Sequence, residues 1–257
     1  MKKNRFFKIL GCALSLLLVA SCTKETTVTL RSFVTKFTNY GTFSLVITEK
    51  DHIVMYWYNR TEVLTYDSRG EAKRRFEEVT QRLGDVAYNQ RVRFIGSIPC
   101  QRYPYNEILS ISVVSDTDFC AEHPAGSSLN GLVRFLSVSP IRFIQSGYRE
   151  TFDWNNACQQ TQALMLDETR VFICGRQIHF PVKGKLADLT QEDFLLLGTG
   201  DSSPWWPKPG YGTTLPGHFI GYLTFEQTPE ISGVHEITVT IHLADGRVLS
   251  RSIEKEF

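Results

Sequence analysis

Residues 235–254, HEITVTIHLADGRVLSRSIE, alternate between apolar and polar side chains, a period of two that suits a β-strand rather than a helix. Thr238, Thr240 and His242 share one face of the first run. The dipeptide Asp245-Gly246 separates the two runs and supplies the positive-φ turn of a hairpin. The sequence therefore predicts an antiparallel hairpin with one apolar face, made by Ile237, Val239, Ile241 and Leu243.

The region 36–118 combines strand-like segments with one helical segment. Two runs rich in β-branched and aromatic residues, TFSLVIT and HIVMYWYN, are followed by EVLTY, which favours two or three strands in a meander. Two later segments, RVRFIGSI and NEILSISVVSD, are also strand-like, and the second alternates Ile111 and Val113 with serines. The order strand-strand-helix-strand predicts an α+β unit over residues 36–118.

The segment 69–83 has helical periodicity. Ser68 and Glu71 fit a capping box, and Gly84 stands where the helix would end. Charged residues at i,i+4 spacing occupy the polar face, which we interpret as a solvated surface. The apolar positions are Ala72, Phe76, Val79 and Leu83, and the expected ion pairs join Lys73 to Glu77 and Glu78 to Arg82.

The region 119–257 contains short strand-like segments between turn signals. LVRFLSVSP, TRVFICGRQIHFPV and HFIGYLTFEQ precede the C-terminal hairpin, and LTQEDFLLLG suits a helical turn. This pattern predicts a β-sandwich-like, immunoglobulin-like unit. The expected fold class is thus α+β and mostly β, and residues 36–257 form either two units or one domain.

Residues 1–21 are predicted to be an export signal. Lys2, Lys3, Arg5 and Lys8 precede an apolar segment, 9–20, that is too short to span a bilayer permanently. The signal ends in VASC, which resembles a bacterial lipobox. That resemblance implies a mature chain that begins at a lipid-modified Cys22, followed by a polar tether over 22–35. An ordinary secretory signal with a chance cysteine is the alternative.

The lipid anchor implies a position in the cell envelope, at the outer membrane. The sequence does not distinguish the periplasmic face of that membrane from its surface face. Two or three acyl chains would hold the protein there almost permanently. The chain has 28 Lys and Arg against 27 Asp and Glu, and removal of the four basic signal residues leaves 24, a net charge of about −3 over 236 residues. By its net charge, such a protein lacks the basic footprint of a chain that binds nucleic acid or an anionic leaflet. The expected partner is the membrane, through Cys22.

Four cysteines remain after the signal and Cys22. An even number in an oxidising compartment predicts two disulfides with three possible pairings, or buried free thiols. Their spacing does not resemble a zinc site, and no cofactor is expected. The four are Cys100, Cys120, Cys158 and Cys174.

Two segments carry candidate functional side chains. The loop VSDTDFCAEHPAGSSLN holds Asp116, Asp118, Glu122 and His123, oxygen and imidazole donors that suit a cation site or acid-base chemistry, although turn formation explains them more simply.

The second segment, GTGDSSPWWPKPGYGTTLPG (198–217), contains Trp205, Trp206 and Tyr211. If these rings are exposed, they suit stacking on sugars or binding a protein partner. The alternative is that they fill one end of the sandwich.

The stretch 114–130, together with FLLLG and YLTFEQTPEISGVHEITVTIHLADGRVLS, resembles exported lipoproteins of Bacteroides-type bacteria that have no assigned function. The resemblance covers residues 105–253. It implies an outer-membrane or surface setting and carries no active-site residues. We therefore expect a non-enzymatic surface protein that binds a glycan or a protein partner, with a hydrolase built on the loop 116–123 as the alternative.

Overall fold

The computed structural model describes residues 25–48, 51–95, 101–153, 177–198 and 218–257. The chain divides into two compact units, Met1–Leu30 with Asn89–Pro99 and Arg31–Tyr88 with Cys100–Phe257. The predicted boundary between residues 118 and 119 thus falls inside the second unit.

The first unit contains a two-stranded antiparallel ribbon of β1 (Glu25–Leu30) and β4 (Gln90–Ile95). Residues 22–35 were expected to be a polar tether, and the structure corrects this over 25–35. ETTVTL forms a strand because its β-branched residues favour extended backbone. The segment that follows is buried, with Phe33 3% and Val34 0% exposed.

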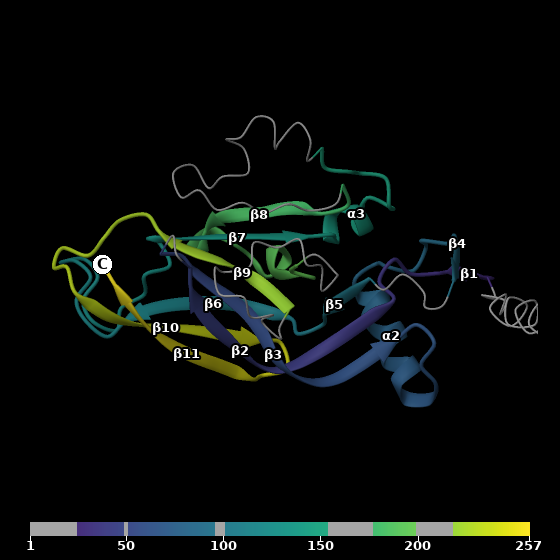
Figure 1. Cartoon of the computed structure of the whole chain (residues 1–257), viewed down its shortest axis with the longest axis horizontal. Helices are drawn as coiled ribbons and strands as arrows, with labels where there is room; N and C mark the ends of the chain where they lie inside the picture. The colour runs from purple at the N-terminus through teal and green to yellow at the C-terminus, as the bar shows by residue number, and fades with distance from the viewer. Residues whose placement is uncertain (1–24, 49–50, 96–100, 154–176, 199–217) are drawn as a thin grey trace, which may run out of the picture. The chain divides into compact units, whose positions relative to one another are not determined.

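The second unit contains a six-stranded and a three-stranded sheet, coloured along the chain in Figure 1. All neighbouring strands are antiparallel except β2 and β5. The larger sheet has the order β5 (Arg102–Pro104), β2 (Lys36–Ile47), β3 (Ile53–Thr65), β9 (His218–Phe225), β7 (Val133–Ser139) and β8 (Phe180–Lys185), and the smaller has β11 (Val248–Glu256), β10 (Val234–Leu243) and β6 (Ile108–Ser115).

The main hydrophobic core combines inward residues of both sheets, so the fold is mostly β and sandwich-like, as predicted. Phe43, Met55 and Trp57 from the larger sheet belong to the same cluster as Ile111 and Val113 from the smaller one. The predicted hairpin is confirmed as β10 and β11, with Gly246 at φ 85° in the turn. Its four predicted inward residues, Ile237, Val239, Ile241 and Leu243, are all buried.

Strands from both predicted regions share the larger sheet, since β2, β3 and β5 lie beside β9, β7 and β8. The division at residue 118 therefore does not separate the two sheets. Sequence periodicity identifies strands but not their partners, because pairing depends on contacts between distant segments. Shorter elements complete the unit: α3 (Ile141–Gln145), η1 (Leu186–Asp188) and η2 (Gln191–Phe194).

The predicted helix is confirmed as α2 (Gly70–Arg82), which buries Phe76 and Val79. Its predicted capping box is wrong, because the Ser68 hydroxyl accepts from the backbone N–H of Thr65 at 3.0 Å and the helix begins after Arg69. The side chain of Lys73 pairs with that of Glu77 at 3.8 Å, as expected. The other expected pair is replaced, since Glu78 pairs with Arg74 and Arg82 with Glu107.

The turn that follows α2 holds the first residues of the second unit in place. Gly84 adopts φ 72°, and the N–H of Asp85 donates to the Thr80 carbonyl at 2.8 Å, a Schellman ending. The buried carboxylate of Asp85 then accepts the backbone N–H groups of Phe33 at 2.7 Å and Val34 at 2.8 Å. This carboxylate explains why residues 33–34 are held in place rather than free as a tether.

Candidate functional site

Several residues selected from the sequence lie outside the described part of the chain. These are Cys22, Cys100, Cys158, Cys174, Trp205, Trp206 and Tyr211. Cys120 is described, and its thiol is free in the structure. The three cysteines expected as its possible partners lie outside the described residues, so the disulfides stay a prediction. The residue lies in a tight turn in which the N–H of His123 donates to the Cys120 carbonyl at 2.9 Å.

The loop carrying Asp116, Asp118, Glu122 and His123 is organised by backbone contacts. Asp116 Oδ1 accepts the N–H of Glu236 at 2.8 Å, and Asp118 Oδ1 accepts that of Ala125 at 2.8 Å. The ring of His123 donates from Nδ1 to the Ser128 carbonyl at 3.0 Å. Within the residues that the structure describes, no three His, Cys, Asp or Glu side chains gather as metal ligands. The two aspartates serve as turn acceptors, the simpler explanation that the sequence favours for them.

A serine–histidine contact lies next to this loop and was missed from the sequence. Nδ1 of His235 is 2.9 Å from Ser115 Oγ and 2.7 Å from Thr117 Oγ1. The histidine is only 3% exposed and packs against the rings of Phe119 and Phe257. Because Ser115 is also buried, at 2%, the pair holds the loop against β10 rather than facing a substrate.

Two further histidines lie inside the second unit. His179 Nε2 is 2.8 Å from the Tyr103 hydroxyl. His218 donates from Nε2 to the carbonyl of Leu197 at 3.0 Å. Burial lowers the pKa of His218 to about 4, so its ring is neutral at pH 7 and acts as a fixed donor.

Leu197, Gly198 and His218 form the attachment point of the aromatic-containing segment 199–217. The N–H of Gly198 donates to the Val138 carbonyl at 2.8 Å, which fixes the residue to strand β7. Gly198 has φ 105°, and a Cβ there would lie 2.5 Å from His218 Nε2. The two residues that bracket 199–217 are therefore in contact with each other, and only glycine fits at this approach.

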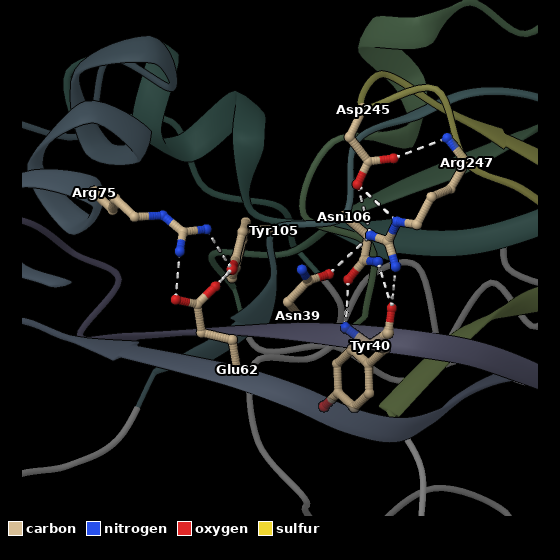
Figure 2. A network of polar contacts seen from close by, with 8 residues as sticks. All are labelled: Asn39, Tyr40, Glu62, Arg75, Tyr105, Asn106, Asp245 and Arg247. Atoms are coloured by element: carbon tan, nitrogen blue, oxygen red, sulfur yellow. Dashed lines mark hydrogen bonds and ion pairs between the residues drawn. The ribbon is translucent and has the colours of Figure 1, made fainter. Parts of the chain in front are cut away.

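A connected set of polar side chains occupies one end of the second unit (Figure 2). In its first half, the Arg75 guanidinium donates to Glu62 Oε1 at 2.5 Å and to the Tyr105 hydroxyl at 3.2 Å. The other Glu62 oxygen accepts from that hydroxyl. Burial, followed by the hydrogen bond to Glu62, raises the pKa of Tyr105 to about 12.

In the second half of the set, the side chain of Asn106 accepts the N–H of Tyr40 and donates to its carbonyl, both at 2.9 Å. Arg247 donates to the same carbonyl at 3.1 Å, to Asn39 Oδ1 at 3.1 Å and to Asp245 Oδ2 at 2.8 Å. Arg247 and Asn106 thus bind the point where the register of β2 shifts between Asn39 and Tyr40.

This polar set joins α2, β2, β3 and the β10–β11 turn. Glu62 uses both carboxylate oxygens in it, and the Arg247 guanidinium donates from each of its nitrogens. Because each of these charged groups has more than one partner on a different segment, the set holds these elements together. No local motif could have revealed the set, because its members come from positions between 39 and 247.

No protein-family model, curated protein or solved structure matches the chain.

Among the described residues, no helix is both long enough and apolar enough to cross a bilayer. The polar clusters there, around His235, His218 and Arg247, are all engaged in internal contacts. The remaining candidate for a binding site is the segment 199–217. Its flanking residues, Gly198 and His218, are in contact with each other.

Proposed function

We propose that the protein is an exported lipoprotein of the cell envelope, in the outer membrane, held by acyl chains on Cys22. The support is the sequence of the first 22 residues: a basic start, a short apolar segment and VASC. The chain that follows Cys22 reaches its first strand at Glu25, so the anchor would lie close to folded protein.

We further propose that the anchored protein is a non-enzymatic binding protein whose segment 199–217 contacts a glycan or a protein. The observation that carries this proposal is the contact between Gly198 and His218, which brings both ends of the segment together next to strand β7. Trp205, Trp206 and Tyr211 within the segment have flat apolar rings with polar edges, which suit recognition of sugars and protein surfaces.

Acylation is tested by expressing the full chain in a bacterial host with a labelled fatty acid. We expect label on the wild-type protein and none on Cys22→Ala, which would also leave the membrane fraction. Cys120→Ala is the matched control, because that thiol is free and should not be acylated. Label retained in Cys22→Ala would refute the anchor.

Binding is tested with the chain from Thr23 on glycan arrays and in pull-downs. The double variant Trp205→Ala, Trp206→Ala is expected to lose at least tenfold in affinity for whatever the wild type binds, while its unfolding midpoint stays unchanged. Tyr58→Ala is the matched control, since this ring is 48% exposed on β3. An unchanged affinity, or a large drop in stability, would show that the two tryptophans are not the binding surface.

A further inference from the structure

The β1–β4 ribbon has two chemically distinct faces. In an antiparallel pair, residues directly opposite each other point to the same side. Val28 therefore shares a half-buried face with Val92, while Thr27 and Thr29 share the other face with Arg93 and Arg91. Glu25, which is opposite Ile95, lies on the same side as these four residues. We call this side the arginine face, and its residues Glu25, Thr27, Thr29, Arg91 and Arg93 are exposed.

The arginine face carries a net positive charge. Glu25 pairs with Arg93. Arg91, opposite Thr29, has no ion-pair partner among the residues that the structure describes. Guanidinium groups bind phosphate oxygens through paired hydrogen bonds, and the neighbouring threonine hydroxyls can donate to the same oxygens.

The position of the ribbon in the chain determines what this face would meet. Glu25 follows Cys22 by three residues, and an extended chain spans at most about 3.5 Å per residue, or about 10 Å here. The headgroup layer of a bilayer is about 5–8 Å thick on each side. An acyl chain on Cys22 would thus keep the start of β1 at the level of the headgroups.

We propose that the arginine face of the β1–β4 ribbon docks on anionic phospholipid headgroups, with Arg91 as the main phosphate ligand and Arg93, which pairs with Glu25, beside it. This inference rests on the proposed lipid anchor, which supplies the proximity. Docking then gives the ribbon a supporting surface, which matters because a two-stranded sheet alone is only marginally stable in water.

The test replaces the natural anchor, so it does not depend on acylation of Cys22. The chain from Thr23, with an N-terminal hexahistidine tag, is captured on vesicles that contain a nickel-chelating lipid in either phosphatidylcholine or phosphatidylcholine with 30% phosphatidylglycerol. One net basic charge near an anionic surface changes affinity about fivefold, and Glu25 offsets one of the two arginines, so we expect dissociation about fivefold slower from the anionic vesicles. The difference should shrink when salt rises from 50 to 300 mM.

The double variant Arg91→Gln, Arg93→Gln should dissociate equally fast from the two kinds of vesicle. The double variant Arg91→Lys, Arg93→Lys should largely keep the slower dissociation from the anionic vesicles. Arg69→Gln, Arg149→Gln is the matched control, with the same change in net charge at exposed arginines of the second unit. Equal dissociation of the wild type from both vesicles would overturn the proposal, as would an equal loss in the control pair. Acylation failing in the Cys22 experiment while this one succeeds would refute only the natural anchor.

Discussion

Buried single residues decide how the second unit responds to acid. His218 is neutral in the folded state and donates to the Leu197 carbonyl, so protonation requires a charge to be placed in the interior. In the unfolded chain the same ring titrates near its usual pKa of 6.5. The unfolded state therefore binds one more proton than the folded state between the two values.

We predict that the contribution of His218 to the free energy of unfolding is constant above about pH 6.5. As the pH drops from 6.5 toward 4, this contribution is lost and the protein becomes less stable. The shift in the pKa of His218 from 6.5 to about 4 corresponds to a loss of about 3 kcal/mol. Urea denaturation at several pH values measures it. His218→Gln should flatten the curve, whereas His242→Gln, at an exposed position of β10, should leave the slope unchanged.

Two asparagine side chains act as strand partners at the scale of the elements. Asn106 binds both backbone groups of Tyr40, where β2 changes register. Asn130 binds β6 in a similar way, accepting from the N–H of Val113 and donating to the carbonyl of Ile111, both at 2.9 Å. Each amide satisfies backbone groups that the sheet ladder leaves unpaired.

Asn106→Ala is therefore predicted to lower the free energy of unfolding by about 1–3 kcal/mol, because it leaves the N–H of Tyr40 without its acceptor, while the Tyr40 carbonyl keeps Arg247 as a donor. The Tyr40 amide should also exchange faster with deuterium. Asn89→Ala is the control, at an exposed asparagine whose φ of 48° is strained for alanine. A loss for Asn106→Ala no greater than for this control would contradict the assignment.

Elements with local signals were predicted well from the sequence. The helix Gly70–Arg82 and the β10–β11 hairpin each follow from periodicity and a glycine at the right place, which are properties of neighbouring residues. Ser68 was assigned to the wrong role because its hydroxyl satisfies a competing turn at Thr65. The strand Glu25–Leu30 was mistaken for a tether because its polar composition hid its pairing with residues 90–95.

Contacts between distant segments set the limits of prediction for the whole molecule. The six-stranded sheet combines strands from both predicted regions, and the polar set around Arg247 draws on positions far apart in sequence. Of the candidate site, the sequence correctly indicated that Asp116 and Asp118 are turn residues. It gave no signal for the contact of His235 with Ser115, since the two lie on different strands.

The two sheets of the second unit are also joined by a charged contact. Lys255 on β11 is 2% exposed, pairs with Asp51 and lies 4.3 Å from the centre of the Phe257 ring. The Asp51 side chain is 63% exposed. Removing the aspartate and removing the lysine therefore have different effects on stability, because only the lysine is buried.

We predict that Asp51→Asn destabilises the protein by about 1–3 kcal/mol, since it leaves a buried ammonium group without its carboxylate. Asparagine tolerates the φ of 65° at this position, so backbone strain does not confuse the result. Lys255→Met should change stability by less than about 1 kcal/mol, because the remaining aspartate is solvated. Thermal unfolding of both variants measures the two changes in stability. A greater loss of stability for Lys255→Met than for Asp51→Asn would contradict this account.

The contact between Gly198 and His218 has a consequence for how this protein can change over time. When both ends of a segment are fixed at one point, each doubling of its length costs only about 0.6 kcal/mol in closure entropy. The scaffold would tolerate replacement of residues 199–217 by segments of other lengths and compositions, provided that Gly198 is kept. The framework would in this way accept the exchange of a single segment without any rebuilding of its core.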